Sequence, residues 1–435
     1  MIKAWMTPWL LMAVPFLGAG LGLLQRSSLQ RMKTSALLTT AASLLVVIGT
    51  PLALGETLVG VPFLCLLPLT AFLSLLGQPL HRDNGPAWTM TLVLLGLGLG
   101  ILTGQAPVHD ILLIILPGIL CSLLYRYQSS AAPDTWRGLS AYGLGMTSAL
   151  LAWLFPAPAS TVALLVACAT LLPLLPAHSG FMATLTGLPG NLPAFLAFLL
   201  PTIGFHTLLS VLPNLTVTTL HTVAILALAG ALYGSLRALI QTRPLPRLAY
   251  GALAFFSLLW WYIADTGTAP MQATVYLSAV GLAASGLLLA WYAIRARYGD
   301  IDLRALGGLA YPMPRFSTLL ALLALAALGM PPFGVFSGFL GMLLMPTFSP
   351  SGPFTVIMIV WLTASWYYID LVQQLVFGRQ RPDIRYEDLR QTEFTSLVLL
   401  LLLLLALGTA PSRFFDSYAP TPAPTVAMQE HTWIR

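Results

Sequence analysis

The stretch Gly329-Met-Pro-Pro-Phe-Gly-Val-Phe-Ser-Gly338 interrupts an apolar run, residues 315–345, that is otherwise long enough for a membrane helix. Pro331 and Pro332 each remove a backbone donor and clash with the preceding turn, so the sequence predicts that the helix breaks there. A break at membrane depth is tolerated only where protein or a water-filled cavity covers the freed backbone groups. The stretch therefore predicts a broken helix inside a larger membrane bundle.

A second stretch, Leu171-Leu-Pro-Leu-Leu-Pro-Ala-His-Ser-Gly180, has the same character, with Pro173 and Pro176 in an apolar run. It falls in the fourth helix expected within residues 88–212, and the first stretch falls in the fourth helix expected within residues 218–378. These two sets begin on opposite sides of the membrane. Broken helices at matching positions of two halves are typical of inverted-repeat transporters, so we predict two inverted five-helix repeats. Two unrelated proline kinks are the alternative.

The composition indicates lipid as the solvent of most of the chain. Hydrophobic residues make up 57% of the sequence and charged residues 8%, whereas a soluble domain carries about 25% charge. The mean hydropathy is +0.85. We expect a single all-α membrane domain over residues 1–435, ending in an extended tail at 417–435. The first apolar run is too long for a cleavable signal and no small-residue cleavage site follows it.

Apolar runs of roughly 17 to 25 residues are long enough to cross the bilayer as helices. About fourteen such spans are expected, at 5–24, 34–54, 58–77, 88–104, 109–126, 137–155, 160–176, 192–212, 218–240, 248–264, 270–294, 315–345, 354–378 and 394–411. Every Lys and Arg between spans follows an odd-numbered span. Basic loops stay in the cytoplasm, so the sequence predicts a multi-pass protein of the inner cell membrane with both termini on the periplasmic side.

The sequence gives no sign of a metal, cofactor or nucleic-acid site. Cys65, Cys121 and Cys168 lie inside apolar spans without ligand spacing, and we interpret them as packing residues. Nucleotide-binding and metalloprotease motifs are missing from the sequence, and the net charge of +6 reflects the basic loops. We expect no cofactor, no metal and no enzyme activity of the chain alone.

Several short sequence motifs occur in the same order and with the same spacing as in a known family. They are Pro173-Leu-Leu-Pro-Ala-His178, Leu232-Tyr-Gly-Ser-Leu-Arg-Ala-Leu-Ile-Gln-Thr242, Arg247-Leu-Ala-Tyr250, Arg297-Tyr-Gly-Asp-Ile-Asp-Leu-Arg-Ala-Leu-Gly-Gly-Leu309, Met313-Pro314 and Leu328-Gly-Met-Pro-Pro-Phe-Gly-Val-Phe-Ser-Gly338. The chain resembles the antiporter-like subunits of respiratory complex I and of Mrp-type antiporters, the proton-conducting membrane transporter family. It is nearest to the M-type subunit, and the likeness is clear from about 170 to 380.

The resemblance implies a line of ionisable residues that conducts protons, and this chain departs from it. The family glutamate falls near Leu116 or Pro117. The two lysines, two histidines and the charged residue of the second break correspond to Leu171, Thr202, Phe255, Val280 and Phe339. Buried lysines can serve because burial and carboxylate neighbours shift their pKa, and apolar side chains bind no proton. We therefore interpret the chain as a degenerate member of the family.

Three residues remain as candidates for an ion path. Asp370 is a carboxylate well inside a span, and such groups are functional hypotheses by default; a structural hydrogen bond or a subunit contact is the alternative. His178 follows the first break and could bind a proton or cap the loosened backbone. His206 lies close to the position of the second lost lysine, where a packed, hydrogen-bonded histidine is the alternative.

These observations leave three functions open. The first is an antiporter-like subunit of a complex I-like or related ion-coupled complex, with lost or reduced proton conduction and lateral faces that bind other membrane subunits. The second is a rerouted proton or cation channel through His178, His206 and Asp370. The third is the membrane subunit of an inorganic-carbon (CO2 or bicarbonate) uptake complex, whose zinc chemistry would belong to a partner.

Overall fold

The structure is a computed structural model that describes residues 2–54, 61–81, 84–127, 133–299, 302–303, 306–344, 353–377 and 387–411. These residues form sixteen α-helices: α1 (Ile2–Leu24), α2 (Leu29–Leu54), α3 (Val61–Leu76), α4 (Gly85–Thr103), α5 (Val108–Arg126), α6 (Pro133–Leu154), α7 (Ala159–Leu171), α8 (Ser179–Gly187), α9 (Leu192–Val211), α10 (Val217–Ile240), α11 (Pro244–Thr266), α12 (Met271–Tyr298), α13 (Pro314–Leu328), α14 (Gly334–Leu343), α15 (Pro353–Phe377) and α16 (Gln391–Thr409). The predicted tail at 417–435 lies outside the described residues.

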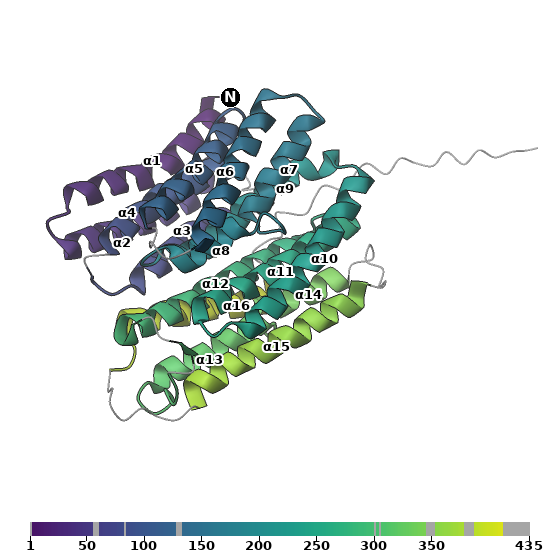
Figure 1. Cartoon of the computed structure of the whole chain (residues 1–435). Coiled ribbons are helices and arrows are strands. Elements are labelled where there is room, and N and C mark those ends of the chain that lie inside the picture. The colour runs from purple at the N-terminus through teal and green to yellow at the C-terminus, as the bar shows by residue number, and fades with distance from the viewer. Residues whose placement is uncertain are drawn as a thin grey trace, which may run out of the picture.

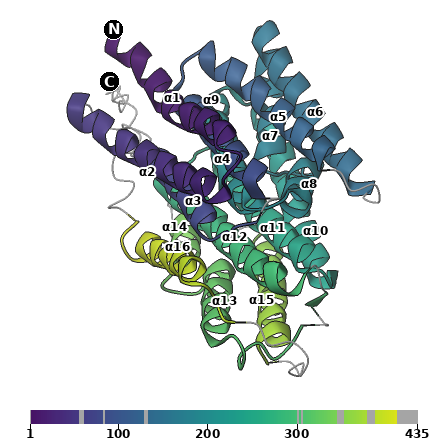
Figure 2. The ribbon, with the colours of Figure 1, turned by 90° about the vertical axis from the view of Figure 1, so that its left-hand side faces the viewer.

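The helices form two adjoining groups along the chain. Figure 1 shows α1–α9, in purple to blue, packed together above α10–α16, in teal to yellow. The same division is visible after a quarter turn (Figure 2). Helix α12 joins the groups, because it contacts α3 and α9 on one side and α11, α13, α14 and α16 on the other. Every residue from Ala273 to Ile294 in α12 is buried.

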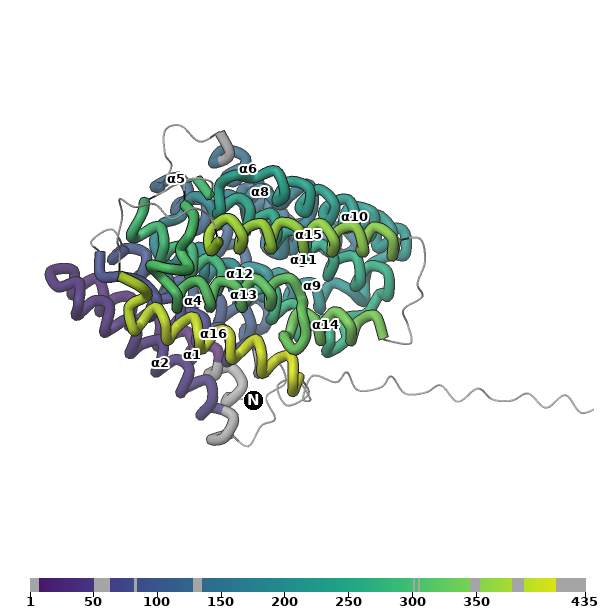
Figure 3. Tube along the Cα trace, turned by 90° about the horizontal axis from the view of Figure 1, so that it is seen from below, coloured from purple at the N-terminus to yellow at the C-terminus, as the bar shows by residue number. Residues whose placement is uncertain are grey.

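Small residues allow close helix contacts inside the second group. A Cβ atom added to Gly234 of α10 would lie 3.0 Å from the backbone of Tyr250 and of Ala254 in α11. Contacts of this kind are the usual basis of helix association in membranes, where lipid is as apolar as the helix faces. Helix α15 packs against α10 and α11, and Figure 3, which is a view from below, shows it in front of them.

The all-helical, multi-pass architecture is confirmed. Nine of the described helices are long and apolar enough to cross a membrane, and five shorter apolar helices accompany them. The helix count exceeds the fourteen predicted spans for two reasons. The run 315–345 is divided into α13 and α14, and α8 occupies the interval 177–191, where no helix was predicted.

Among the described residues, five cations between the predicted spans lie in helices, namely Arg31, Lys33, Arg247, Arg295 and Arg297, and two of them, Lys33 and Arg247, are buried. Lys33 is in the first turns of α2 and Arg247 is in the first turns of α11, and the two residues are 9% and 5% exposed. The placement of Lys33 and Arg247 in loops between spans was therefore wrong. The helices begin earlier than the apolar runs because polar residues are tolerated in their first turns.

Candidate functional site

The first predicted break is present and is covered by protein. Helix α7 ends at Leu171 and α8 begins at Ser179. The N–H groups of Leu172 and Leu174 donate to carbonyls of α7, and the carbonyl of Leu172 accepts a hydrogen bond of 3.0 Å from the indole Nε1 of Trp260. Trp260, from α11, is 1% exposed. A buried donor from another helix therefore replaces the partner that the broken helix has lost.

His178 immediately precedes α8. Its side chain makes no hydrogen bond to the first turn of that helix. Its ring packs edge-on against Tyr233, with 5.6 Å between centroids. Within the described part of the chain, the buried Nδ1 atom has no hydrogen-bond partner. Arg137 and Tyr250 line a hollow of 370 Å³ beside it.

The second break is packed between the end of α13 and the helices α15 and α16. Helix α13 ends at Gly329 in the left-handed conformation (φ 81°), and the N–H groups of Gly329 and Met330 donate to the carbonyls of Ala326 and Leu325. This pattern terminates a helix with its carbonyls satisfied. A Cβ atom on Gly329 would overlap the indole of Trp361 in α15, and one on Gly408 of α16 would overlap the carbonyl of Pro332.

Four aromatic side chains fill the space beside the second break, and we call them the aromatic cluster. The Trp361 ring lies 4.3 Å from the ring of Phe339 and 5.2 Å from that of Phe255, and Tyr276 lies 6.2 Å from Phe339. The Tyr276 hydroxyl donates to the carbonyl of Phe255 over 3.1 Å. Phe255 and Phe339 are two of the positions where the resemblance places ionisable groups.

The other three such positions are also buried and without charge. Leu171 is 1% exposed and Val280 is 5% exposed. Thr202 is fully buried, and its hydroxyl donates to the carbonyl of Phe198, one turn earlier in α9, over 2.7 Å. Each of these side chains is thus satisfied by packing or by its own helix.

Asp370 is ion-paired. Its Oδ2 atom accepts from Nη1 of Arg247 at 2.7 Å, and both carboxylate oxygens accept from the amide of Gln374. Arg247 also donates twice to the carbonyl of Gln241. The Asp370 side chain is 32% exposed. Because Arg247 had been assigned to a loop, sequence reasoning missed this partner.

His206 lies one turn beyond Thr202 in α9 and faces a second histidine. The rings of His206 and His109 are 6.0 Å apart. Nδ1 of His109 lies 3.0 Å from the carbonyl of Ile101. A carbonyl oxygen only accepts, so Nδ1 of His109 donates this bond. The structure thus places His109, which is not among the candidates named from the sequence, next to His206.

The family profile described as NADH:quinone oxidoreductase/Mrp antiporter, transmembrane, matches residues 139–365, which include both breaks and the aromatic cluster. The chain belongs to this family. It is 27% identical over 282 residues to NAD(P)H-quinone oxidoreductase chain 4 1 of Synechococcus sp. (strain JA-3-3Ab), a match that covers 61% of this chain and 54% of the relative. It is 29% identical over 197 residues to NADH-quinone oxidoreductase subunit M of Escherichia coli (strain K12), covering 44% and 38%. The matches thus span about half, or less, of these relatives.

Solved structures share the fold over nearly the whole chain. A chain of respiratory complex I from Thermus thermophilus superposes with a TM-score of 0.78 at 20% identity, covering 94% of this chain and 97% of that one. A chain of the Mrp complex from Dietzia sp. DQ12-45-1b superposes with a TM-score of 0.77 at 14% identity, covering 97% and 98%. Both solved structures are described as complexes, and the likeness establishes the fold.

In this family member, buried charges gather at one end of the bundle rather than along its centre. Arg297 of α12 donates to Glu393 of α16 through two bonds, of 2.6 and 3.2 Å, and their side chains are 10% and 3% exposed. Lys33 of α2 donates to the carbonyls of Leu76, at 3.3 Å, and of Gln78. We call Lys33, Gln78, Arg297 and Glu393 the charged clasp, because these residues connect α2, the end of α3, α12 and α16.

Sequence reasoning missed the charged clasp, although one local signal was present. Glu393 stands three residues after Arg390 at the start of the last apolar run, and its carboxylate accepts the backbone N–H of Arg390. A glutamate at this position commonly closes the first turn of a helix. The pairing with Arg297, 96 residues away in sequence, left no local trace.

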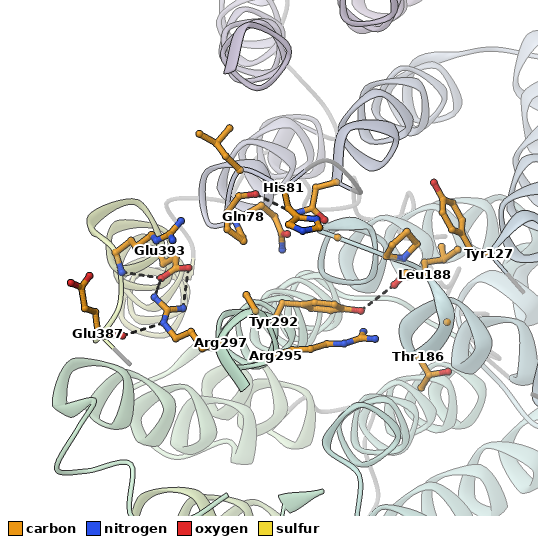
Figure 4. Close-up of a pocket in the computed structure, with 18 residues that line it drawn as sticks. Gln78, His81, Tyr127, Thr186, Leu188, Tyr292, Arg295, Arg297, Glu387 and Glu393 are labelled. Carbon is orange, nitrogen blue, oxygen red and sulfur yellow. Dashed lines mark hydrogen bonds and ion pairs between the residues drawn. The ribbon is translucent and has the colours of Figure 1, made fainter. Parts of the chain in front are cut away.

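A hollow of 940 Å³ adjoins the charged clasp, and we call it the vestibule. Figure 4 shows Arg297 with Glu393 and Glu387 at one end, Tyr127 and Thr186 at the other, and Tyr292 and Arg295 between them. Gln78 and His81 form the opposite wall. A smaller hollow of 430 Å³, lined by Lys33, shares Gln78 and Glu393 with it.

Proposed function

We propose that this chain is an antiporter-like membrane subunit of a multi-subunit, ion-coupled complex whose proton conduction along the family axis is lost or reduced. Its helical scaffold binds neighbouring subunits side by side, in a complex resembling quinone oxidoreductases or Mrp antiporters. The chain is no enzyme by itself and needs no cofactor of its own. Its place is the inner cell membrane, with two inverted repeats, 88–212 and 218–378, and both termini toward the periplasm.

The aromatic cluster is the observation that carries this proposal. Phe255 and Phe339 pack on Trp361 at the second break, where the family resemblance calls for groups that bind protons. Leu171, at the first break, is 1% exposed. Apolar side chains dewet a channel as well as failing to bind protons. A conducting line through these five positions would therefore be interrupted at both breaks.

Proton flux into liposomes tests the proposal. The purified chain, reconstituted alone, is expected to take up protons under an imposed potential at a rate near that of empty liposomes. The reason is that none of the five family positions carries an ionisable group, and apolar side chains, which four of them carry, dewet a channel. The comparison is a family member with lysines at the positions of Leu171 and Thr202, measured with the same pH-sensitive dye. Saturable uptake by this chain above the empty-liposome rate contradicts the proposal.

A rerouted channel is the second candidate, favoured by the contact between His206 and His109. In that case Asp370→Asn and His206→Gln would each abolish ion transport by the assembled complex. If Asp370 instead stabilises the fold through Arg247, Asp370→Asn lowers the melting temperature and the yield of complex, and transport per complex is unchanged. The two outcomes are separated by normalising flux to the amount of assembled complex.

A further inference from the structure

The vestibule has the size and position of a ligand site. Its volume of 940 Å³ is within the range of roughly 300 to 1,000 Å³ that is usual for small-molecule pockets. It lies between the two helix groups, where the ends of α3 and α8 meet those of α12 and α16. Nothing in the proposed loss of conduction gives this hollow a role.

The charged lining of the vestibule has an excess of positive charge. Three arginines (Arg295, Arg297 and Arg390) line it, and its acidic residues are Glu387 and Glu393. Arg297 and Glu393 neutralise each other through their ion pair. The described lining therefore holds three arginines and two carboxylates. His81 lies on the same wall as Gln78.

Gln78 supplies an independent sign of a missing ligand. Its side chain is 3% exposed and lines the vestibule. Within the described residues, its amide Nε2 has no hydrogen-bond partner. A buried donor without an acceptor costs roughly 1–3 kcal/mol. An anionic oxygen in the vestibule would supply the acceptor.

Arg295 lines the vestibule on the side opposite Gln78. Its guanidinium lies 5.7 Å from the ring centroid of Tyr292, whose hydroxyl donates to the carbonyl of Leu188 over 3.1 Å. The Tyr292 ring is therefore fixed, and it supports the guanidinium from one side. In Figure 4 the Arg295 side chain extends along the vestibule toward Thr186.

We propose that the vestibule binds a phosphate-bearing anion through the Arg295 guanidinium and the Gln78 amide. The planar fork of arginine matches phosphate oxygens in geometry and charge. Basic pockets between membrane helices at the cytoplasmic side bind the headgroups of anionic lipids, and a soluble phosphate compound offers the same oxygens. The site stands apart from the interrupted axis, so it is independent of whether the chain conducts protons.

Binding to the full-length, detergent-purified chain tests this site with two probes. One probe is inorganic pyrophosphate, and the other is cardiolipin in mixed micelles, each titrated while the melting temperature and the bound fraction are followed. Arg295→Gln is expected to weaken the binding of the active probe by about tenfold or more, as the loss of a charge-assisted contact does. Gln78→Leu, which removes the unpaired amide, is expected to weaken binding while preserving the fold.

Arg243→Gln is the matched control, because Arg243 is a basic residue 74% exposed and lies outside the vestibule lining. It should leave the affinity unchanged. Binding of cardiolipin alone identifies a lipid headgroup, and binding of pyrophosphate identifies a soluble phosphate compound; either supports the site. Equal losses for Arg295→Gln and Arg243→Gln, or no binding of either probe, overturn the proposal. So does binding of an acidic peptide when both phosphate probes fail.

Discussion

Glu393 has two tasks, and both depend on its charge. It accepts both bonds from the buried guanidinium of Arg297 and also the backbone N–H of Arg390 at the start of α16. Removal of one member of a buried ion pair leaves the other charge without compensation. The stability of the charged clasp therefore depends mainly on the negative charge of Glu393.

Glu393→Gln is expected to destabilise the fold by about 3 kcal/mol, the lower end of the range for breaking a buried pair. The measurement is the melting temperature of the purified protein in detergent. The control is Asp302→Asn, which removes the partner of Arg243 in an exposed pair (74% and 56% exposed) and should change stability by less than about 1 kcal/mol. Similar shifts for the two variants would show that the clasp contributes no more than a surface pair.

At the level of helices, both breaks depend on distant elements that cover them. Gly329 ends α13 with a positive φ, and the Trp361 indole occupies the space where its side chain would stand. Gly329→Ala combines the left-handed penalty of roughly 1–2 kcal/mol with this overlap. We expect a lower melting temperature and a disturbed tryptophan fluorescence spectrum.

The matched control for Gly329→Ala is Gly143→Ala, in the middle of α6. A Cβ atom there meets no described atom within 4 Å, and alanine favours a helix over glycine by about 0.5–1 kcal/mol. This variant should be unchanged or slightly more stable. A Gly329→Ala protein as stable as the control would mean that the second break does not need its left-handed glycine.

The prolines made both breaks predictable, because their effect on a helix is local. Helix α8 was not predicted, since its nine residues are too few to show a clear period between the turns that flank them.

The partner of Asp370 was also missed. Arg247 stands 123 residues away, and a span assignment based on hydropathy places a charged residue outside the helix even when a partner allows it to lie inside. The aromatic side chains Phe255 and Phe339 could be read directly from the sequence, whereas their contact with Trp361 depended on the packing of α15.

Across the whole molecule, the last helix returns to the first group of helices. The Ser396 hydroxyl of α16 donates to the carbonyl of Leu73 in α3 over 2.7 Å, 323 residues earlier in the chain. A Cβ atom built on Gly77 lies 3.3 Å from the Cβ atom of Ser396. Disulfides form between Cβ atoms roughly 3.5–4.5 Å apart, so a small adjustment makes this pair suitable.

The double variant Gly77→Cys with Ser396→Cys, made after replacing the three native cysteines by alanine, is expected to form an intramolecular disulfide with a lipid-soluble copper oxidant. The product should migrate faster on a non-reducing gel and revert with dithiothreitol. Gly77→Cys alone supplies the baseline. Failure of the double variant to react, with both thiols accessible to a maleimide, would place α16 away from α3.

The aromatic cluster also has an electrical consequence. A transmembrane voltage does work on a protein only through the charge that moves in its field, about 2.3 kcal/mol per elementary charge for each 100 mV. The rings of Phe255, Phe339 and Trp361 carry no net charge, so rearrangement of these side chains at the second break would register no gating current. A relative with a lysine at the Phe255 or Phe339 position would sense the voltage at this point. If this chain has lost conduction as proposed, the conformation at this point is set by packing and not by the energised state of the membrane.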